Sequence, residues 1–531
     1  MKIKNRKKMN LFEIIKKQFR AHPVFYLFFF AQLMINVPHS IPFNNELDVM
    51  MVAKHFVNPH WIPGDWYLGQ KIAYRYLFNA IAGGICVLMP LSAAIITGRI
   101  IVTLMFSYIF EKFSLIFSIK YFVIFPFLIY LLKNQSMVSR EWFIGGFETK
   151  AFAYFFVFLT MISIMKKKKN IPFLFGGLAF SFHILIGFYG IACVVLGYLI
   201  TYRQDIKIPN ISEMIKSSII SVVAGLPGLY SVFQYLFTSA DSNRDLAAKI
   251  YVKYRVSHHV LPLAWNNHFW PILFAIALVI YLSILFKAEN RKCKFLASIG
   301  IISQLFFMVG LVIFFLGKIT LLRYYWFRFA DIYIPLSLII LLAAFISNKV
   351  ITGYKKNRLI SKLKKAFLVL TLILCLLLLL LGTSNYMKFY EERSEKYTNI
   401  SSEIFEAFDW ISKNTNKESL FLVGPDMANY FYYMAERPVF VSFKHSPQND
   451  DQIIEWYKRL RLCNGGDELS SQISAWENSQ ILERKFFSLS EKDIRRIVVE
   501  YNIDYFLDKK DKILEFKIVF ENKEYRLYKI Y

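Results

Sequence analysis

Cysteine is scarce in this chain, and charged side chains are few. The five cysteines (Cys86, Cys193, Cys293, Cys375 and Cys463) are scattered over 531 residues and form no Cys-x-x-Cys motif and no Cys/His cluster. Their spacing indicates neither a disulfide framework nor a zinc site. Only 19% of the residues are charged, whereas 56% are hydrophobic. This apolar share exceeds what the core of a soluble protein needs.

Acidic residues are also in short supply. The chain has 38 Asp and Glu against 64 Lys and Arg, which gives a formal net charge of +26. The positive residues are grouped between apolar runs and do not form one basic face. This distribution argues against nucleic acid as a partner and is typical of the loops that set membrane topology.

Long apolar runs are abundant, and the mean hydropathy is +0.38. Runs of roughly 15 to 25 residues fit a bilayer with a hydrocarbon core of about 30 Å. No A-x-A cleavage site follows the first run, at 23–37, and many further runs do, so we expect an uncleaved anchor. The sequence therefore predicts a polytopic α-helical membrane protein with about eleven transmembrane helices, thirteen being the alternative.

The positive clusters predict how these helices are oriented. Clusters at 166–169, 202–207, 287–294 and 349–365 should be cytoplasmic by the positive-inside rule. Spans are then expected at 213–236, 270–286, 295–316, 331–348 and 366–383, with two short spans at 171–201 that turn near residue 187, and with two or four crossings at 77–133. This topology puts the N-terminus in the cytoplasm and the C-terminus outside.

The chain changes character near residue 385. Residues 1–384 are predicted to form a membrane core with a large first external loop at 39–76, and residues 385–531 to form a small external α/β domain. The latter contains no G-x-G-x-x-G, P-loop or G-x-S-x-G motif, so we assign it no chemistry. Four of its polar residues are interpreted as surface-loop residues, with substrate contact as the alternative: Lys444, His445, Asp450 and Asp451.

Polar segments that lack clusters of Lys and Arg all emerge on the predicted external side. They are residues 39–76, 139–150, His183, 237–269 and 323–331. Because ionisable groups near membrane depth are costly and usually face a cavity or pathway, we expect these loops to share one external site.

Several of these features together resemble the GT-C class of integral membrane glycosyltransferases, which use polyprenyl-phosphate-linked sugars. They are the acids just after the first span, the many spans, the polar external loops and the external α/β domain. More narrowly, five segments resemble a bacterial multi-pass family of that type whose function has only been inferred: "GGFETKAFAYFFVFL", "GGLAFSFHILIGFYG", "YRVSHHVLP", "RYYWFRFAD" and "RPVFVSFKHSP". The resemblance implies a GT-C-like core and an extracytoplasmic site in the bacterial cytoplasmic (inner) membrane and cell envelope.

In GT-C enzymes an acid of the first external loop acts as a base or orients the acceptor. The matching position here is Asp48, with Glu46 as the alternative because the sequence reads E-L-D and not two adjacent acids. Side chains two positions apart on a helix point in directions about 200° apart, so we expect only one of the two acids to face the site. Glu148 is the best second acid. N-terminal capping of a helix that starts near Glu46 is the competing interpretation.

The candidate ligands of a donor phosphate are basic residues and histidines from the same loops. Positive groups are needed there because negative charge develops on the departing phosphate, and arginine binds phosphate oxygens bidentately. The candidates are Arg255, His258, His259, Arg328, His183 and Arg140. Each candidate has an alternative interpretation. The His258–His259 pair could pack in the protein or bind a metal, and Arg328 could pair with Asp331. His183 could have a structural role in its helix, and Arg140 could lie on the surface.

These observations predict a membrane glycosyltransferase that moves a sugar from a polyprenyl-phosphate-linked donor to an acceptor that the sequence does not specify. A multi-pass transporter and a non-catalytic envelope assembly protein are the alternatives. No internal duplication of the kind common in transporters is evident. We assign no metal ligands and leave a divalent cation open, because some enzymes of the GT-C class use one and others do not.

Overall fold

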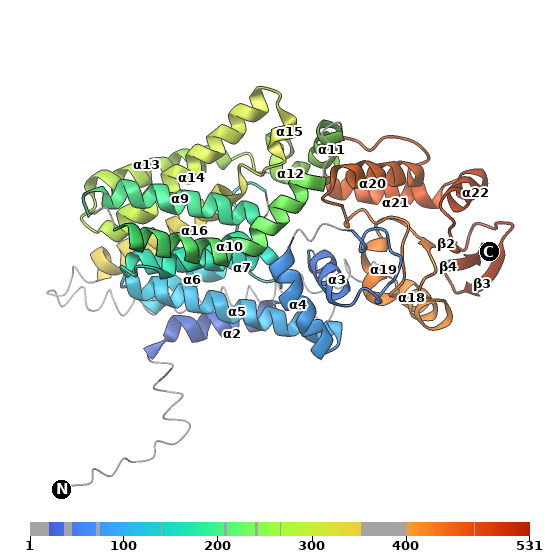
Figure 1. Cartoon of the computed structure of the whole chain (residues 1–531), viewed down its shortest axis with the longest axis horizontal. Helices are drawn as coiled ribbons and strands as arrows, with labels where there is room; N and C mark the ends of the chain where they lie inside the picture. The colour runs from blue at the N-terminus through green and yellow to red at the C-terminus, as the bar shows by residue number, and fades with distance from the viewer. Residues whose placement is uncertain are drawn as a thin grey trace, which may run out of the picture.

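The computed structural model describes residues 18, 21–36, 45–70, 75–139, 141–205, 210–238, 243–265, 267–351, 401–471 and 473–530. Long helices lie side by side in a bundle at one end of the molecule, and a smaller α/β unit (residues 401–530) lies at the other (Figure 1). The predicted boundary at residues 384 and 385 lies outside the described residues.

The bundle is built from apolar helices. Its long members are α5 (Leu91–Ile116), α9 (Ile184–Tyr202), α10 (Ile211–Thr238), α13 (Trp270–Lys287), α14 (Arg291–Phe315) and α16 (Arg328–Phe345), and shorter apolar helices are α2 (Pro23–Asn36), α4 (Tyr76–Leu88), α6 (Tyr121–Lys133), α7 (Thr149–Met165) and α8 (Ile171–Phe182). Among the described residues, 6 helices are long and apolar enough to cross a membrane. The chain is a polytopic helical membrane protein, as predicted.

Helices α10, α13, α14 and α16 lie where the sequence predicts spans, whereas the span expected at 366–383 lies outside the described residues. The prediction of a turn near residue 187 is wrong, because α8 and α9 meet at His183, whose backbone is extended (φ −154°, ψ 105°). Gly187 instead lets the two helices approach closely. A Cβ there would lie 2.4 Å from the Cα of Phe180.

Residues 76–133 form three helices, of which α5 alone is long and apolar enough to cross a membrane, so the two or four crossings expected at 77–133 stay a prediction. Helix α4 packs against α3 (Glu46–Val57), where a Cβ added to Gly83 would lie only 2.3 Å from the carbonyl oxygen of Ala53. Helix α5 contains two charged residues, Arg99 and Glu111, and each has a partner inside the protein.

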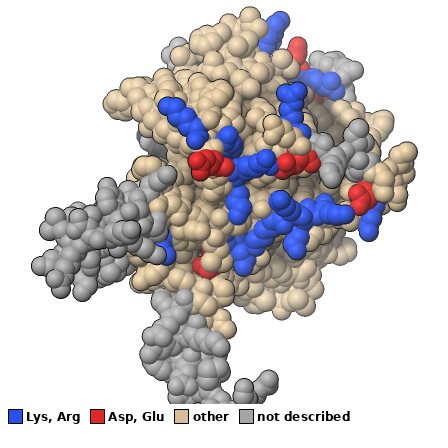
Figure 2. Space-filling model, turned by 90° about the vertical axis from the view of Figure 1, so that its left-hand side faces the viewer, with Lys and Arg blue, Asp and Glu red and all other residues tan. Residues whose placement is uncertain are grey.

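The predicted cytoplasmic clusters at 166–169 and 287–294, and the described part of the cluster at 202–207, lie at the end of the bundle that faces away from the α/β unit, whereas residues 352–365 of the fourth cluster lie outside the described residues. Figure 2 views this end and shows Lys and Arg side chains gathered across it, with fewer acids among them. Two ion pairs join neighbouring connections there: Lys169 with Glu213 at 3.2 Å, and Arg291 with Asp205. Exposed Lys and Arg at this end are what the positive-inside rule predicts for a cytoplasmic face.

We expect the basic end to face the cytoplasm and the α/β unit to lie outside. Lys168 and Lys458 are exposed at the two opposite ends of the molecule. In intact cells, a membrane-impermeant maleimide should modify Lys458→Cys, but should reach Lys168→Cys only after permeabilisation. The parent protein, with its native cysteines, gives the background. Modification of position 168 in intact cells would contradict this orientation.

The α/β unit carries a small sheet covered by helices. Its elements are α18 (Ser402–Asn414), β1 (Phe421–Leu422), α19 (Ala428–Met434), α20 (Asp450–Cys463), α21 (Ala475–Phe487), α22 (Glu491–Glu500), β2 (Tyr505–Lys509), β3 (Lys517–Glu521) and β4 (Tyr525–Lys529). The sheet order is β1-β2-β4-β3, with β1 parallel to β2 and the other pairs antiparallel. The runs "FKIVF" and "YRLYKI" around "ENKE" predict a hairpin, and this hairpin is present as β3 and β4.

Two details of this unit concern its sequence pattern. The composition of the run "PVFVSF" (438–443) predicts a strand, but the run makes only one isolated parallel bridge, between Val439 and Phe421. Helix α21 begins with a capping box of Ser474 and Glu477.

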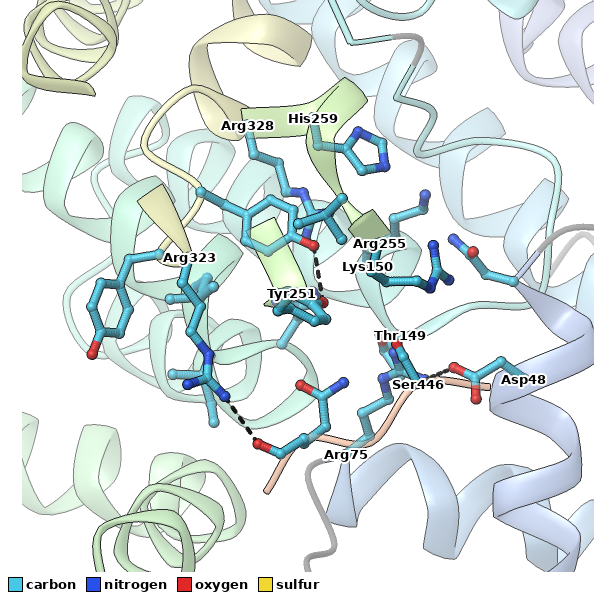
Figure 3. Close-up of a pocket in the computed structure, with 18 of the residues that line it drawn as sticks. Asp48, Arg75, Thr149, Lys150, Tyr251, Arg255, His259, Arg323, Arg328 and Ser446 are labelled. Carbon is cyan, nitrogen blue, oxygen red and sulfur yellow. Dashed lines mark hydrogen bonds and ion pairs between the residues drawn. The ribbon is translucent and has the colours of Figure 1, made fainter. Parts of the chain in front are cut away.

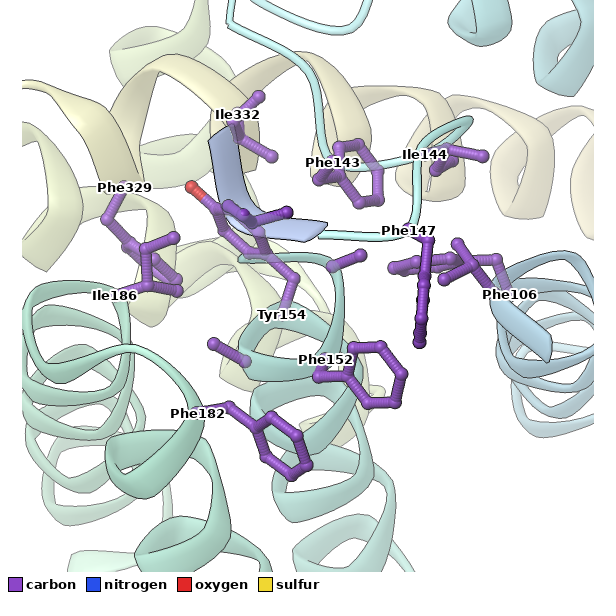
Figure 4. Packing of buried hydrophobic residues seen from close by; sticks show 14 of the residues in the cluster. Phe106, Phe143, Ile144, Phe147, Phe152, Tyr154, Phe182, Ile186, Phe329 and Ile332 are labelled. Carbon is purple, nitrogen blue, oxygen red and sulfur yellow. The ribbon is translucent and has the colours of Figure 1, made fainter. Parts of the chain in front are cut away.

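Aromatic side chains form the core around the start of α7. Phe143, Phe147, Phe152 and Tyr154 are buried around the start of α7 and pack against α5, α8 and α16 (Figure 4). Gly98 of α5 is required there, because a Cβ would lie 2.1 Å from the Phe147 ring. This packing fixes the loop that precedes α7.

Candidate functional site

A cavity of about 410 Å³ lies where the bundle meets the α/β unit. This volume is within the usual range for small-ligand sites. Its lining comes from α3, α7, α9, α10, the segment 251–259, the segment 323–328 and residues 444–448. Figure 3 shows Arg75, Lys150, Arg255, Arg323 and Arg328 arranged around this space. Loops far apart in the sequence are thus brought together at one end of the bundle.

Asp48 lines the cavity from the first turn of α3. Its carboxylate accepts a hydrogen bond from the Tyr67 hydroxyl and one from Nη1 of Arg75 at 2.8 Å. Burial alone would raise the pKa of Asp48, but the positive charge of Arg75 and the Tyr67 hydrogen bond hold that pKa below its ordinary value. Asp48 is therefore a carboxylate at neutral pH.

Glu46 does not line the cavity. Its side chain is fully buried, pairs with Nη2 of Arg99 at 2.5 Å and accepts the backbone N–H of Phe147 at 2.8 Å. The pair joins α3 to α5 and to the loop before α7. Glu46 thus supports the wall that carries Asp48, and neither acid forms a side-chain cap on α3, whose N-cap, Asn45, also makes no capping hydrogen bond.

Glu148 is the second acid that lines the cavity. It accepts hydrogen bonds from Asn45 and from the indole of Trp142, both at 3.0 Å, and pairs with Lys150 at 3.3 Å. Asn45 also accepts from the Lys444 ammonium at 3.2 Å. Asn45 therefore links the second acid to the α/β unit.

Hydrogen bonds to Asp331 hold the loop between α6 and α7. Asp331 at the start of α16 is fully buried and accepts the backbone N–H groups of Met137 at 2.7 Å and Val138 at 2.6 Å, along with the Ser139 hydroxyl. The interpretation that Asp331 pairs with Arg328 is wrong, because Asp331 is occupied by this loop. These hydrogen bonds fix the chain just before Glu141.

Glu141 forms the hub of a buried charge network. It pairs with the Lys150 ammonium and, at 3.0 Å, with Nε of Arg328, and its Oε2 lies 3.7 Å from Nδ1 of His259. Although burial would raise the pKa of Glu141, Lys150 and Arg328 hold it well below its usual value. The network fixes three of the cavity's nitrogen-bearing side chains, and the Arg328 guanidinium also stacks 3.7 Å from the Tyr325 ring centroid.

The segment 251–260 presents three of the predicted ligands. A single π-helical turn, Tyr251–Arg255, is followed by α12 (Ser257–Val260), and such turns are frequent at functional sites. Arg255, His258 and His259 all line the cavity. Burial, aided by Arg255, lowers the pKa of His258 to about 4, so this ring is neutral at pH 7.

The remaining predicted ligands have different outcomes. His183 lines the cavity and its Nδ1 accepts the backbone N–H of Ile186 at 3.4 Å, so it also caps α9. Arg140 lies outside the described residues.

The surface-loop interpretation of residues 444–451 is wrong for three of the four residues. Lys444 lines the cavity, and burial and the neighbouring Arg255 lower its pKa to about 8. His445 is 1% exposed and bridges the Ser442 hydroxyl, at 2.8 Å, to the carbonyl oxygen of Leu47 in α3, at 2.9 Å. Asp450 is fully buried and pairs with Arg323 at 2.5 Å.

Cavity residues to which the sequence analysis assigns no role include Arg75, Thr149, Lys150, Tyr235 and Arg323. Arg75, Lys150 and Arg323 lie inside the predicted external segments 39–76, 139–150 and 323–331, so a search for every cation in those segments finds all three. Lys444 had no such signal because it comes from the α/β unit.

No group of three or more His, Cys, Asp or Glu side chains that could hold a metal ion occurs among the described residues. The two acids that line the cavity, Asp48 and Glu148, are each paired with a cation.

The fold is similar to that of known membrane enzymes. The archaeal oligosaccharyltransferase AglB from Archaeoglobus fulgidus, solved with an inhibitory peptide and a dolichol-phosphate, matches with a TM-score of 0.52 at 9% identity, over 93% of this chain and 70% of that chain. Another structure, the Archaeoglobus fulgidus oligosaccharyltransferase with Zn and sulfate, has a TM-score of 0.43 at 9% identity, over 92% of this chain and 68% of that chain.

Sequence similarity adds little to this. Residues 402–463 match a family described as a domain of unknown function (DUF6798). No curated protein matches the chain. At 9% identity the likeness to AglB describes the fold alone, and that fold is a GT-C-like helical membrane core joined to a small α/β unit.

Proposed function

We propose that the chain is an extracytoplasmic membrane glycosyltransferase that takes its sugar from a polyprenyl-phosphate-linked donor. The observation that carries the proposal is the cavity at one end of an apolar bundle, lined by six Lys and Arg side chains and only two acids. Such a site suits an anionic headgroup whose hydrophobic tail stays among the helices. The GT-C-like fold is consistent with it.

In this proposal Asp48 orients the acceptor. Its two oxygens are held by Tyr67 and Arg75, yet each keeps a lone pair for another donor. The acceptor's nucleophilic atom bonds to the sugar's anomeric carbon while the bond from that carbon to the phosphate oxygen breaks. The electron pair leaves on the phosphate, and the acceptor proton, acidified by the new bond, passes to Asp48.

In the same proposal the phosphate is held by Arg255 and the two histidines that follow it in the chain. Arg255 donates one hydrogen bond, to the carbonyl oxygen of Lys444 at 3.1 Å, while its buried Nε has no hydrogen-bond partner among the described residues. A guanidinium with unused donors is well suited to bind a phosphate oxygen. His258 and His259 adjoin it and are placed to donate to the same group in a suitable tautomer.

The transporter and assembly-protein alternatives predict other results at the same residues. A transporter needs alternating access, whereas this cavity is bounded by buried ion pairs at Glu141 and Asp450 that join separate elements. An assembly protein has no need for a carboxylate held in its charged form beside the cavity. Both alternatives predict that Asp48 does not affect sugar transfer.

Purified full-length protein, added to membranes of cells that lack it, should move label from a radiolabelled polyprenyl-linked sugar into a new product. Arg255→Ala should weaken donor binding about tenfold or more, because hydrogen bonds to charged groups contribute about 1.5–3 kcal/mol. The exposed Arg496→Ala, whose ion pair lies on the surface of α22, is the matched control and should bind normally. No transfer from any polyprenyl-linked donor would refute the proposal.

A further inference from the structure

The Lys and Arg side chains that line the cavity differ in whether a carboxylate lies close enough to pair with them. Four of its six cations have a carboxylate within ion-pairing distance: Arg75 with Asp48, Lys150 with Glu141 and Glu148, Arg323 with Asp450 and Arg328 with Glu141. Those four carboxylates balance those four cations. Within the described part of the chain, Arg255 and Lys444 have no such carboxylate.

The two unbalanced cations are neighbours. Nη2 of Arg255 donates to the backbone carbonyl oxygen of Lys444, so the guanidinium and the lysine belong to one wall of the cavity. Lys444 extends to Asn45, beside the acids Asp48 and Glu148. The nearby histidines do not change this count, because burial keeps the pKa of His258 at about 4 and that of His259 well below its ordinary value.

Two partly buried, uncompensated positive charges are unfavourable, because removing a charge from water is costly unless it is paired. The lowered pKa of Lys444 is one sign of that cost. An anion that carries two charges would satisfy both groups. A sugar linked through one phosphate is a phosphodiester with one negative charge, whereas a sugar linked through a diphosphate carries two.

We propose that the donor carries a diphosphate between lipid and sugar, with Arg255 and Lys444 neutralising its two charges. The inference rests on the proposed function and narrows it to one class of donor. Arg255 and Lys444 are then specificity-determining residues: with a single phosphate, the positive charge of one of the two would stay uncompensated in a partly buried site.

The test compares two sugar-free probes with the same polyprenyl chain, a methyl phosphate ester with one charge and a methyl diphosphate ester with two. Binding to the full-length protein in detergent should favour the diphosphate by about ten- to a hundredfold, as expected for one added hydrogen-bonded charge. Lys444→Gln and Arg255→Gln should each bring the two affinities close together.

Two controls separate charge from folding. Lys444→Arg should retain the preference, because the charge remains, and Lys458→Gln should leave it unchanged, because Lys458 is exposed on α20 and pairs with Glu500. Equal binding of both probes by the wild type, tighter binding of the monophosphate, or a preference that survives both glutamine variants would overturn the inference. Binding of neither probe would count against the proposed function itself.

Discussion

Asp48→Asn should lower sugar transfer by about 10²- to 10⁴-fold, the usual cost of losing a general base, while donor binding changes little. The substitution keeps the size of the side chain and an oxygen that can accept from Tyr67. It removes the negative charge that orients the acceptor and takes its proton. Transfer and donor binding should be measured separately on the same preparation.

The pH dependence gives a second measurement on this residue. Because the pKa of Asp48 is held below the ordinary 3.8, its carboxylate stays charged down to pH values lower than that. Loss of transfer through Asp48 is therefore expected only in strong acid, and no acidic limb from this group should occur between about pH 5 and 8. A limb in that window would indicate a different base.

A matched control is Asp493→Asn on the surface of α22, which should transfer normally. Transfer by Asp48→Asn at the wild-type rate would move the role to Glu148, the other acid that lines the cavity. Substituting Glu46 would not distinguish these roles, because Glu46 is part of the buried ion pair with Arg99.

Glu46→Gln should lower the free energy of unfolding by about 3–5 kcal/mol, the usual cost of leaving one partner of a buried ion pair alone. Both side chains are fully buried. The glutamine oxygen can still accept the N–H of Phe147, so the loss reports mainly on the lost ion pair between Glu46 and Arg99. Reversible denaturant titration in detergent measures it.

The double variant Glu46→Gln/Arg99→Met should be more stable than Glu46→Gln alone, because it removes the stranded charge. Arg495→Met, which breaks an exposed pair on α22, should cost at most about 1 kcal/mol and serves as the control. A double variant that is less stable than the single one would show that the arginine stabilises the bundle without its partner.

Some of the site could be predicted from the sequence because it depends on polarity along the chain. Asp48, Glu148, Arg255 and His258 stand out as polar residues between apolar runs, and all four line the cavity. The parity of the basic clusters also predicted that these loops share one end of the bundle. The local sequence pattern does not decide which of the two acids, Glu46 or Asp48, faces the cavity. That depends on the residues with which each acid pairs in the folded chain.

The α/β unit shows where local pattern stops being informative. Its helices and hairpin follow from periodicity, but "PVFVSF" has the composition of a strand and forms none beyond one bridge. Tertiary contacts compete there with strand pairing: His445 and Lys444, just beyond this run, reach α3 and Asn45. Of the residues interpreted as a surface loop, Lys444 therefore lines the cavity, and His445 and Asp450 are buried.

The sequence by itself determined that this is a polytopic helical membrane protein with its polar loops on one side, since a bilayer requires long apolar runs and asymmetric positive charge. Only the tertiary structure decided which charges remain to bind a ligand. Ion pairs such as Arg323 with Asp450 join residues more than a hundred positions apart. Whether a charge is compensated depends on its distance in space from an opposite charge. The two cations without a carboxylate partner, Arg255 and Lys444, are therefore evident only from the tertiary structure.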